Sequence, residues 1–241
     1  MGLIAENVSK VRERIAAAAA RSGRSADDIT LVCVTKTRTA SEIREVIEAG
    51  EYQLGENRVQ ELMEKYGTIQ DIAGNMPEKP NIVWNLIGQL QRNKVKYIAG
   101  KVALIHSVDS FKLAEEIDAR AAKAGKSSDV LIQVNPAGEA QKSGVALSEC
   151  IALSKEISGR LAYVKIRGLM AVVPIASDPE YVRPYFRDAK LTFDALAGEC
   201  GGAENGFEHL SMGMTDDYEV AVEEGATIVR IGTGIFGPRN A

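Results

Sequence analysis

The sequence predicts an α/β protein folded as a single (β/α)8 TIM barrel, on the strength of three observations. Eight short runs rich in aliphatic and β-branched residues are spread along the chain, and the stretches between them have helical periodicity. The chain has 241 residues, close to the roughly 250 residues that one such barrel needs. No internal repeat or linker-like segment is visible, so we expect one domain over residues 1–241.

The expected strands alternate with helical segments, which is typical of a parallel sheet. The most loop-like stretch is residues 72–81, IAGNMPEKPN, because glycine, proline and asparagine gather there. In chain order, the expected strands cover residues 29–35, 52–56, 81–87, 102–108, 129–135, 164–171, 207–213 and 227–232.

Helices are expected where apolar residues recur at intervals of three and four. Thr39 and Glu42 have the spacing of a capping box, and Gly50 is placed to end the helix that follows. Pro184 lies inside a later apolar stripe, so that helix should either begin near Arg183 or be kinked there. A further apolar stripe before the first strand predicts an extra N-terminal helix that closes one end of the barrel; its members are Ile4, Val8, Val11, Ile15 and Ala18.

The charge distribution argues against a nucleic-acid partner. The formal net charge is -4, and the lysines and arginines are scattered along the chain. A protein that follows a phosphate backbone needs a basic stripe or patch. We therefore expect no nucleic acid among the partners.

The cysteines favour a reducing compartment, and the apolar runs give no sign of a membrane anchor. Cys33, Cys150 and Cys200 are an odd number without metal-type spacing, which argues against a disulfide framework. The alanine run 16–20 is too short to span a membrane, and Glu6 stands where a myristoylation motif needs Ser or Thr. We expect a cytoplasmic protein without a membrane anchor.

Lys36 follows the first expected strand, at the end of the barrel where enzymes of this fold keep their reactive groups. A lysine partly withdrawn from water loses its proton more easily, and the free amine is the form that condenses with an aldehyde. The alternative is a lysine that extends to solvent from a strand end. This stretch alone leaves both interpretations open.

Small and hydroxyl-bearing residues follow the last two strands, and they predict a phosphate site. Ser211, Gly232 and Thr233 are the expected phosphate cradle, because loops after strands seven and eight bind phosphate in this fold. Taken singly, each loop could be a turn or a helix cap. The spacing from Gly232 to Gly237 also matches a dinucleotide motif, but too few residues follow for the helix and strand that NAD binding requires.

Arg230 lies within the last expected strand, between Val229 and Ile231. A guanidinium on a buried strand is costly unless acceptors match its donors. One candidate acceptor is the ring nitrogen of a pyridine cofactor, and the other is a carboxylate such as Glu208. An amine, a phosphate cradle and an arginine for a ring nitrogen together describe a site for pyridoxal 5′-phosphate (PLP).

Six motifs in the sequence resemble those of the YggS/PROSC family of PLP homeostasis proteins, and they extend over nearly the whole chain. One departure is Asn85, where the family pattern leads us to expect His. The motifs are CVTKTR, GENRVQE, WNLIGQLQRNK, VNPAGEAQKSG, GLMAVVP and SMGMTDDYEVAVEEGATIVRIGTGIFG.

The resemblance implies a barrel similar to the N-terminal domain of alanine racemase, with PLP held as an imine on Lys36. It implies that Arg230 lies towards the pyridine nitrogen and that Asn57, in GENRVQE, lies beside the cofactor. Ser211, Gly232 and Thr233 fall within the family's phosphate-binding motifs. His106 and His209, the only histidines, are expected in structural roles.

Three functions remain possible on the sequence. A guanidinium donates to a ring nitrogen without protonating it, which weakens PLP as an electron sink, and we expect no further domain to supply a second catalytic base. A carrier that holds PLP, serves vitamin B6 and amino-acid homeostasis and passes PLP to apo-enzymes is therefore the first hypothesis, as a monomer or weak dimer. The alternatives are a weakly active PLP-dependent amino-acid racemase and a cofactor-free aldolase that uses Lys36.

Overall fold

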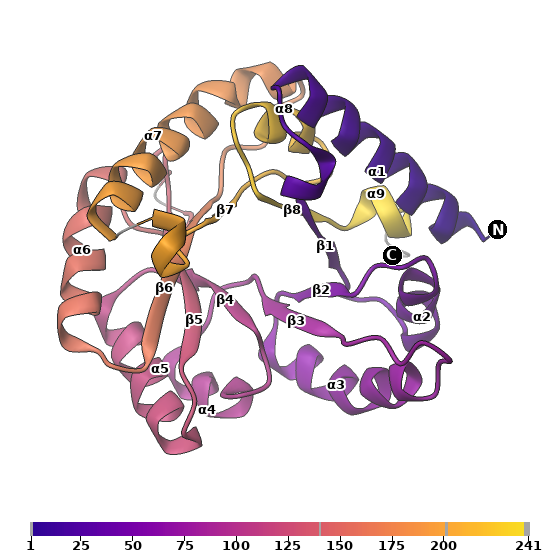
Figure 1. Ribbon diagram of the computed structural model, residues 1–241, viewed down its shortest axis with the longest axis horizontal. Helices are drawn as coiled ribbons and strands as arrows, with labels where there is room; N and C mark the ends of the chain where they lie inside the picture. The colour runs from indigo at the N-terminus through magenta and orange to yellow at the C-terminus, as the bar shows by residue number, and fades with distance from the viewer. Residues whose placement is uncertain (1, 140, 201, 239–241) are drawn as a thin grey trace.

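A computed structural model describes residues 2–139, 141–200 and 202–238. Eight parallel strands form a closed barrel in chain order, and β8 pairs with β1 to complete the circle (Figure 1). Helices lie between the strands and surround them. The predicted (β/α)8 barrel is confirmed, while the two ends of the expected domain, residues 1 and 241, lie outside the described residues.

Each strand overlaps one of the eight expected runs, although most are shorter than expected. The bounds are β1 Thr30–Val34, β2 Gln53–Glu56, β3 Val83–Leu86, β4 Leu104–Val108, β5 Ser128–Val134, β6 Val164–Ala171, β7 His209–Ser211 and β8 Ile228–Ile231.

The helix predictions hold in two places and fail in one. Thr39 and Glu42 form the capping box reciprocally, and one helix begins at Arg183. Residues 72–74 of the expected loop are helical, because helix periodicity continues to Gly74 before the prolines. The helices are α1 Leu3–Arg21, α2 Ala40–Glu48, α3 Val59–Gly74, α4 Val95–Ile98, α5 Phe111–Ala124, α6 Leu147–Arg160, α7 Arg183–Cys200, α8 Tyr218–Glu223 and α9 Thr233–Phe236, with short 3-10 turns η1 Ala26–Asp28, η2 Arg92–Lys94, η3 Pro179–Val182 and η4 Gly202–Asn205.

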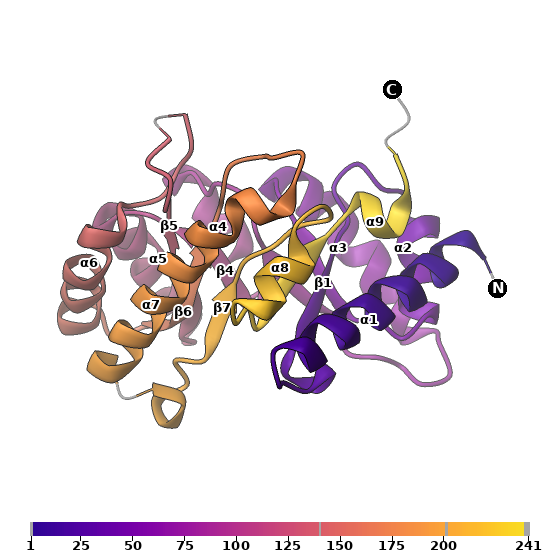
Figure 2. The same cartoon turned by 90° about the horizontal axis from the view of Figure 1, so that it is seen from above.

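The N-terminal helix α1 exists, but it does not close an end of the barrel. It lies on the outside, alongside α2, α8 and α9 (Figures 1 and 2). Asn7 donates to the carbonyl of Ile235, and Arg14 pairs with Glu219. Because α8 and α9 are short, they leave apolar surface beside β8 and β1 that the buried stripe of α1 covers.

The barrel interior has an apolar layer and, towards the carboxyl ends of the strands, a polar one. The apolar layer consists of Val32, Leu104, Leu131, Met170 and Ile228. Side chains alternate along a strand, so positions two residues further on also face inward. His106 and Arg230 occupy such positions.

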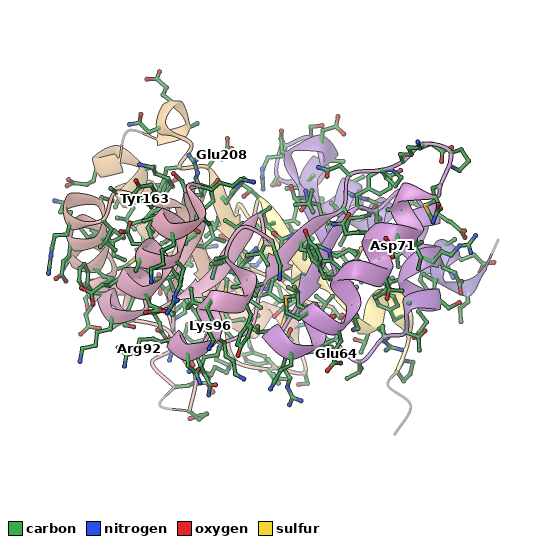
Figure 3. The ribbon with its side chains drawn as sticks, turned by 90° about the horizontal axis from the view of Figure 1, so that it is seen from below. Glu64, Asp71, Arg92, Lys96, Tyr163 and Glu208 are labelled. Atoms are coloured by element: carbon green, nitrogen blue, oxygen red, sulfur yellow. The ribbon has the colours of Figure 1, made fainter. Side chains whose placement is uncertain are left out.

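The outer surface is charged and carries no long apolar helix. Arg92 and Lys96, from the basic stretch around η2 and α4, lie on the outside of the molecule (Figure 3). Lys96 and Lys94 lie over the ring of Tyr97. Among the described residues, none of the helices is long and apolar enough to cross a lipid bilayer.

Candidate functional site

A cavity of about 340 Å³ opens where the strands end, and we call it the mouth cavity. The loops that follow the strands rise on this side of the barrel (Figure 2). Five of the six predicted site residues line the cavity, and the sixth, Ser211, does not. Its lining residues are Val34, Lys36, Arg38, Asn57, Ile87, Met170, Val172, Ile175, Met214, Thr215, Asp216, Arg230, Gly232 and Thr233.

Lys36 reaches the mouth cavity from the end of β1. Val32 faces the barrel interior and Val34 lines the cavity, so Lys36 continues the same face of the strand. Its side chain is half-buried. The next residue, Thr37, has a φ of 63°, a left-handed conformation that is unfavourable for a β-branched residue. Lys36 therefore lies next to an unfavourable backbone conformation that contacts with neighbouring residues must stabilise.

A cluster formed by Glu56, Glu61 and Lys65 holds that segment on both sides of Lys36. Nζ of Lys65 donates to the carbonyl of Thr35 at 2.6 Å and to one oxygen each of Glu56 and Glu61 at 2.7 Å. The backbone N–H of Thr37 donates to Glu61. Both glutamates lie within the motif GENRVQE, whereas Lys65 lies outside all six motifs.

Glu56 is a buried carboxylate within this cluster. Its Oε1 also accepts a hydrogen bond from the hydroxyl of Thr35 at 2.7 Å. Burial raises the pKa of Glu56, although hydrogen bonds from Lys65 and Thr35 act in the opposite direction. Oε2 has no hydrogen-bond partner in the described part of the chain.

Arg230 is almost completely buried at the base of the mouth cavity. Nη1 donates to Oγ of Ser211 at 2.6 Å and Nη2 to the carbonyl of Ala171 at 3.2 Å. Burial lowers the pKa of Arg230 to about 10, while the more distant charge of Asp217 acts against this. Two hydrogen bonds use only part of its five N–H donors.

The alternative pairing of Arg230 with Glu208 does not occur. Glu208 is exposed and lies at the edge of the molecule (Figure 3). Among the described residues, no carboxylate forms an ion pair with Arg230. The guanidinium is thus a buried cation next to a cavity without a neutralising carboxylate in contact.

Ser211, expected in the phosphate cradle, lies behind Arg230 and has no exposed surface. Its hydroxyl contacts Nδ1 of His106 at 3.0 Å, and Nε2 of His106 contacts Oδ1 of Asn85 at 3.2 Å. Because β7 ends at Ser211, this side chain still points into the barrel, below the loop that reaches the cavity. The structure does not bring Ser211 to the cavity wall.

Thr215 supplies the hydroxyl that the β7 loop presents to the cavity. Its Oγ1 accepts hydrogen bonds from the hydroxyl of Thr233 at 3.1 Å and from the backbone N–H of Gly234 at 3.2 Å. Gly213 permits this turn, because it has a φ of 90° and a Cβ there would lie 2.6 Å from Ala221. The sequence prediction assigned this place in the phosphate cradle to Ser211.

Asn57 lines the mouth cavity on the side of β2. A Cβ at Gly88 would lie 2.2 Å from the carbonyl oxygen of Asn57 and 2.7 Å from its Cα. Glycine at position 88 therefore allows the loop after β3 to pack directly against the backbone of Asn57.

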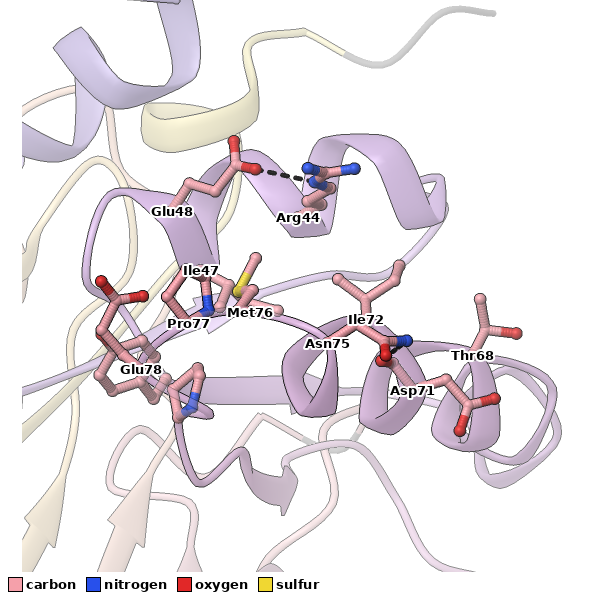
Figure 4. A pocket seen from close by; sticks show the side chains of 12 residues that line it. Arg44, Ile47, Glu48, Thr68, Asp71, Ile72, Asn75, Met76, Pro77 and Glu78 are labelled. Carbon is pink, nitrogen blue, oxygen red and sulfur yellow. Dashed lines mark hydrogen bonds and ion pairs between the residues drawn. The ribbon is translucent and has the colours of Figure 1, made fainter.

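A larger hollow of about 690 Å³ lies on the side of the barrel, between α2 and the end of α3 (Figure 4). Its visible polar contacts are the ion pair of Arg44 with Glu48, both exposed, and the hydrogen bond from Nδ2 of Asn75 to the carbonyl of Asp71. It contains none of the predicted site residues and lies away from the strand ends, where reactive groups of this fold gather. The smaller mouth cavity is the candidate site.

Residues 4–240 match the protein family described as alanine racemase, N-terminal domain. A pyridoxal phosphate homeostasis protein of Aquifex aeolicus is 46% identical, with 97% of each chain covered. One of Escherichia coli K12 is 39% identical over 100% of this chain and 98% of its own. PipY of Synechococcus elongatus PCC7942, solved with PLP bound, is 33% identical with a TM-score of 0.80, covering 97% of this chain and 100% of PipY.

Proposed function

The chain belongs to the alanine racemase N-terminal domain family and to its pyridoxal phosphate homeostasis proteins, and we propose that it binds PLP in the mouth cavity. The proposal includes an imine between the PLP aldehyde and Nζ of Lys36, and transfer of PLP to apo-enzymes in the cytoplasm. In this way the protein would serve intracellular PLP and amino-acid homeostasis.

One observation carries the proposal: Lys36, Arg230, Thr215 and Thr233, which bear an amine, a guanidinium and two hydroxyls, line the same cavity. These groups match the three functional parts of PLP, which are an aldehyde, a ring nitrogen and a phosphate. Arg230 forms two hydrogen bonds and, within the described part of the chain, no ion pair with a carboxylate, so it retains donors for a neutral acceptor such as a pyridine nitrogen. The residues present therefore fit the cofactor.

Each part of the cavity has a distinct task in this proposal. Lys36 would hold the aldehyde as an imine, with loss of water, and so mask a reactive carbonyl. Arg230 would donate to the ring nitrogen, and Asn57 would line the side of the site next to the ring. The hydroxyls of Thr215 and Thr233 and the backbone N–H groups after Gly232 bind the phosphate.

Arg230 also favours a carrier over an enzyme. PLP accelerates amino-acid chemistry by accepting electrons, most strongly when its ring nitrogen is protonated. A guanidinium keeps its own proton at working pH and leaves none on the ring. At the cavity mouth, Ile175 is 90% exposed, so the site has an apolar, open rim through which PLP can leave.

Borohydride reduction followed by peptide mapping tests the imine. Reduction of the PLP-loaded protein is expected to fix the cofactor on the peptide that contains Lys36. Lys36→Ala should lose this label, whereas Lys190→Ala, on the outside of α7, should keep it. Label on other lysines only would refute the assignment.

Two further measurements separate a carrier from an enzyme. The loaded protein should activate a PLP-dependent apo-enzyme at least as fast as free PLP does at equal concentration. Slower delivery would contradict transfer. Rapid exchange of the α-hydrogen of any amino acid, tested in deuterium oxide, would favour a racemase instead.

A further inference from the structure

A line of four buried polar side chains crosses the barrel interior from β8 to β3. Arg230, Ser211, His106 and Asn85 are each at most 5% exposed. They are joined by contacts of 2.6, 3.0 and 3.2 Å in that order. The sequence analysis placed Ser211 in the phosphate cradle and His106 in a structural role, and the resemblance led us to expect His at position 85.

The donors and acceptors fix the direction of this line at both ends. Arginine only donates, so Oγ of Ser211 accepts from Arg230. At the other end, Nδ2 of Asn85 donates to Oε1 of Gln53 at 3.1 Å. It also lies 3.3 Å from the carbonyl of Leu54 and 3.4 Å from that of Val83. These acceptors orient the amide, so Oδ1 of Asn85 faces His106 as an acceptor.

His106 therefore carries a proton on Nε2, which faces Oδ1 of Asn85. Its charged form would place a second buried cation beside Arg230, and both burial and the nearby guanidinium lower the pKa of His106 well below its ordinary value. A neutral imidazole protonated on Nε2 has a lone pair on Nδ1. The hydroxyl of Ser211 then donates to Nδ1.

We propose that Ser211, His106 and Asn85 are positioning residues that form a one-way hydrogen-bond chain, Arg230 to Ser211 to His106 to Asn85, which aims the guanidinium of Arg230 at the cofactor's ring nitrogen. The hydrogen-bond chain ends on the side-chain oxygen of Gln53 and on two backbone carbonyls, and none of its four members is an anion. It holds Nη1 from behind, and the carbonyl of Ala171 holds Nη2. The role of the chain towards PLP rests on the proposed function.

The first test uses PLP and its 1-deaza analogue, in which carbon replaces the ring nitrogen. Wild type should bind PLP about tenfold more tightly than the analogue, since a hydrogen bond to a charged group is lost. Ser211→Ala should reduce this ratio to about threefold or less. Asn85→Leu should also lower the ratio of the two affinities.

Ser107→Ala is the matched control. Ser107 lies in the same strand as His106, is 1% exposed, and its hydroxyl has no hydrogen-bond partner among the described residues. It should keep the wild-type ratio. The proposal would be overturned if both variants lowered the ratio of the two affinities equally. It would also be overturned if Ser211→Ala left this ratio unchanged.

The second test needs neither ligand nor mutation. Nitrogen-15 NMR of the histidine rings in the unliganded protein should show His106 neutral and protonated on Nε2. Protonation on Nδ1, or on both nitrogens, would overturn the chain. If wild type binds neither PLP nor its analogue, the proposed function fails. The NMR measurement still tests whether the hydrogen-bond chain exists.

Discussion

Nζ of Lys65 lies 2.7 Å from Oε1 of Glu56, a residue with no exposed surface. The same ammonium donates to the carbonyl of Thr35 and to Glu61. Glu61 in turn accepts from the backbone of Thr37. One half-buried cation, together with Glu61, thus joins α3 to both residues that flank Lys36.

Lys65→Met should lower the free energy of unfolding by about 3 kcal/mol at neutral pH, because it leaves the Glu56 carboxylate buried without a cation. Chemical denaturation measures this loss. Lys190→Met, which removes the exposed pair with Asp194, should cost about 0.5 kcal/mol or less. Equal losses in the two variants would contradict a central role for Lys65.

The same variant should have a characteristic pH dependence. Burial already raises the pKa of Glu56, and loss of Lys65 raises it further. A carboxylate with a raised folded-state pKa favours folding below its unfolded pKa and loses this contribution as the pH rises through the folded value. The loss of unfolding free energy in Lys65→Met should therefore be smaller in acid. The double variant Lys65→Met with Glu56→Gln should recover part of this loss.

Arg230→Met should separate binding from stability. The buried guanidinium has no carboxylate partner in contact, so removal of its charge offsets the loss of two hydrogen bonds. The free energy of unfolding without ligand should change by about 1 kcal/mol or less. The affinity for PLP should fall about tenfold or more. A loss of several kcal/mol without ligand would show that Arg230 is mainly structural.

The barrel could be predicted because its signals are local. Each strand is a short aliphatic run between turn residues, and the capping box at Thr39 and the proline at position 184 mark helix starts within a few residues. The position of α1 was not predictable in this way. A stripe of apolar residues shows that a helix is buried, but its partner depends on how short α8 and α9 turn out to be.

The candidate site was predictable only to the level of loops. The pattern after β7 and β8 indicated a cradle, but three-dimensional register decides whether Ser211 or Thr215 faces the cavity. The contacts of Lys65 with Thr35 and of His106 with Ser211 could not be read from the sequence, since each joins two different βα units. Long-range pairs of this kind leave no periodic signal.

Thr215→Val together with Thr233→Ala should weaken binding of PLP about tenfold to a hundredfold, because the variant loses the two hydroxyls to which we assign the phosphate. Binding of pyridoxal, which has no phosphate, should change little. Equilibrium titration with both aldehydes measures the contrast. Thr192→Ala, on the outside of α7, is the control. A similar loss for pyridoxal would place the phosphate elsewhere.

An ion-pair network attaches α8, the helix after the β7 loop, to α7. Arg183 pairs with Glu223 at 2.6 Å and with Glu224 at 2.9 Å. Burial alone would raise the pKa of Glu223 and of Glu224, but hydrogen bonds from arginines, including Arg183, outweigh it and lower both pKa values. Arg21 adds a second contact to Glu223 from α1.

These lowered pKa values predict a loss of stability in acid. A carboxylate with a depressed folded-state pKa stabilises the fold above its unfolded pKa, which is about 4.3 for glutamate, and this contribution disappears as the pH falls through the folded value. Arg183→Met should cost about 2 kcal/mol at neutral pH and flatten the decline below about pH 4.5. Arg44→Met, which removes an exposed pair with Glu48, should leave the decline unchanged. Urea unfolding at several pH values distinguishes the two variants, and parallel curves for wild type and Arg183→Met would show that these carboxylates do not govern stability in acid.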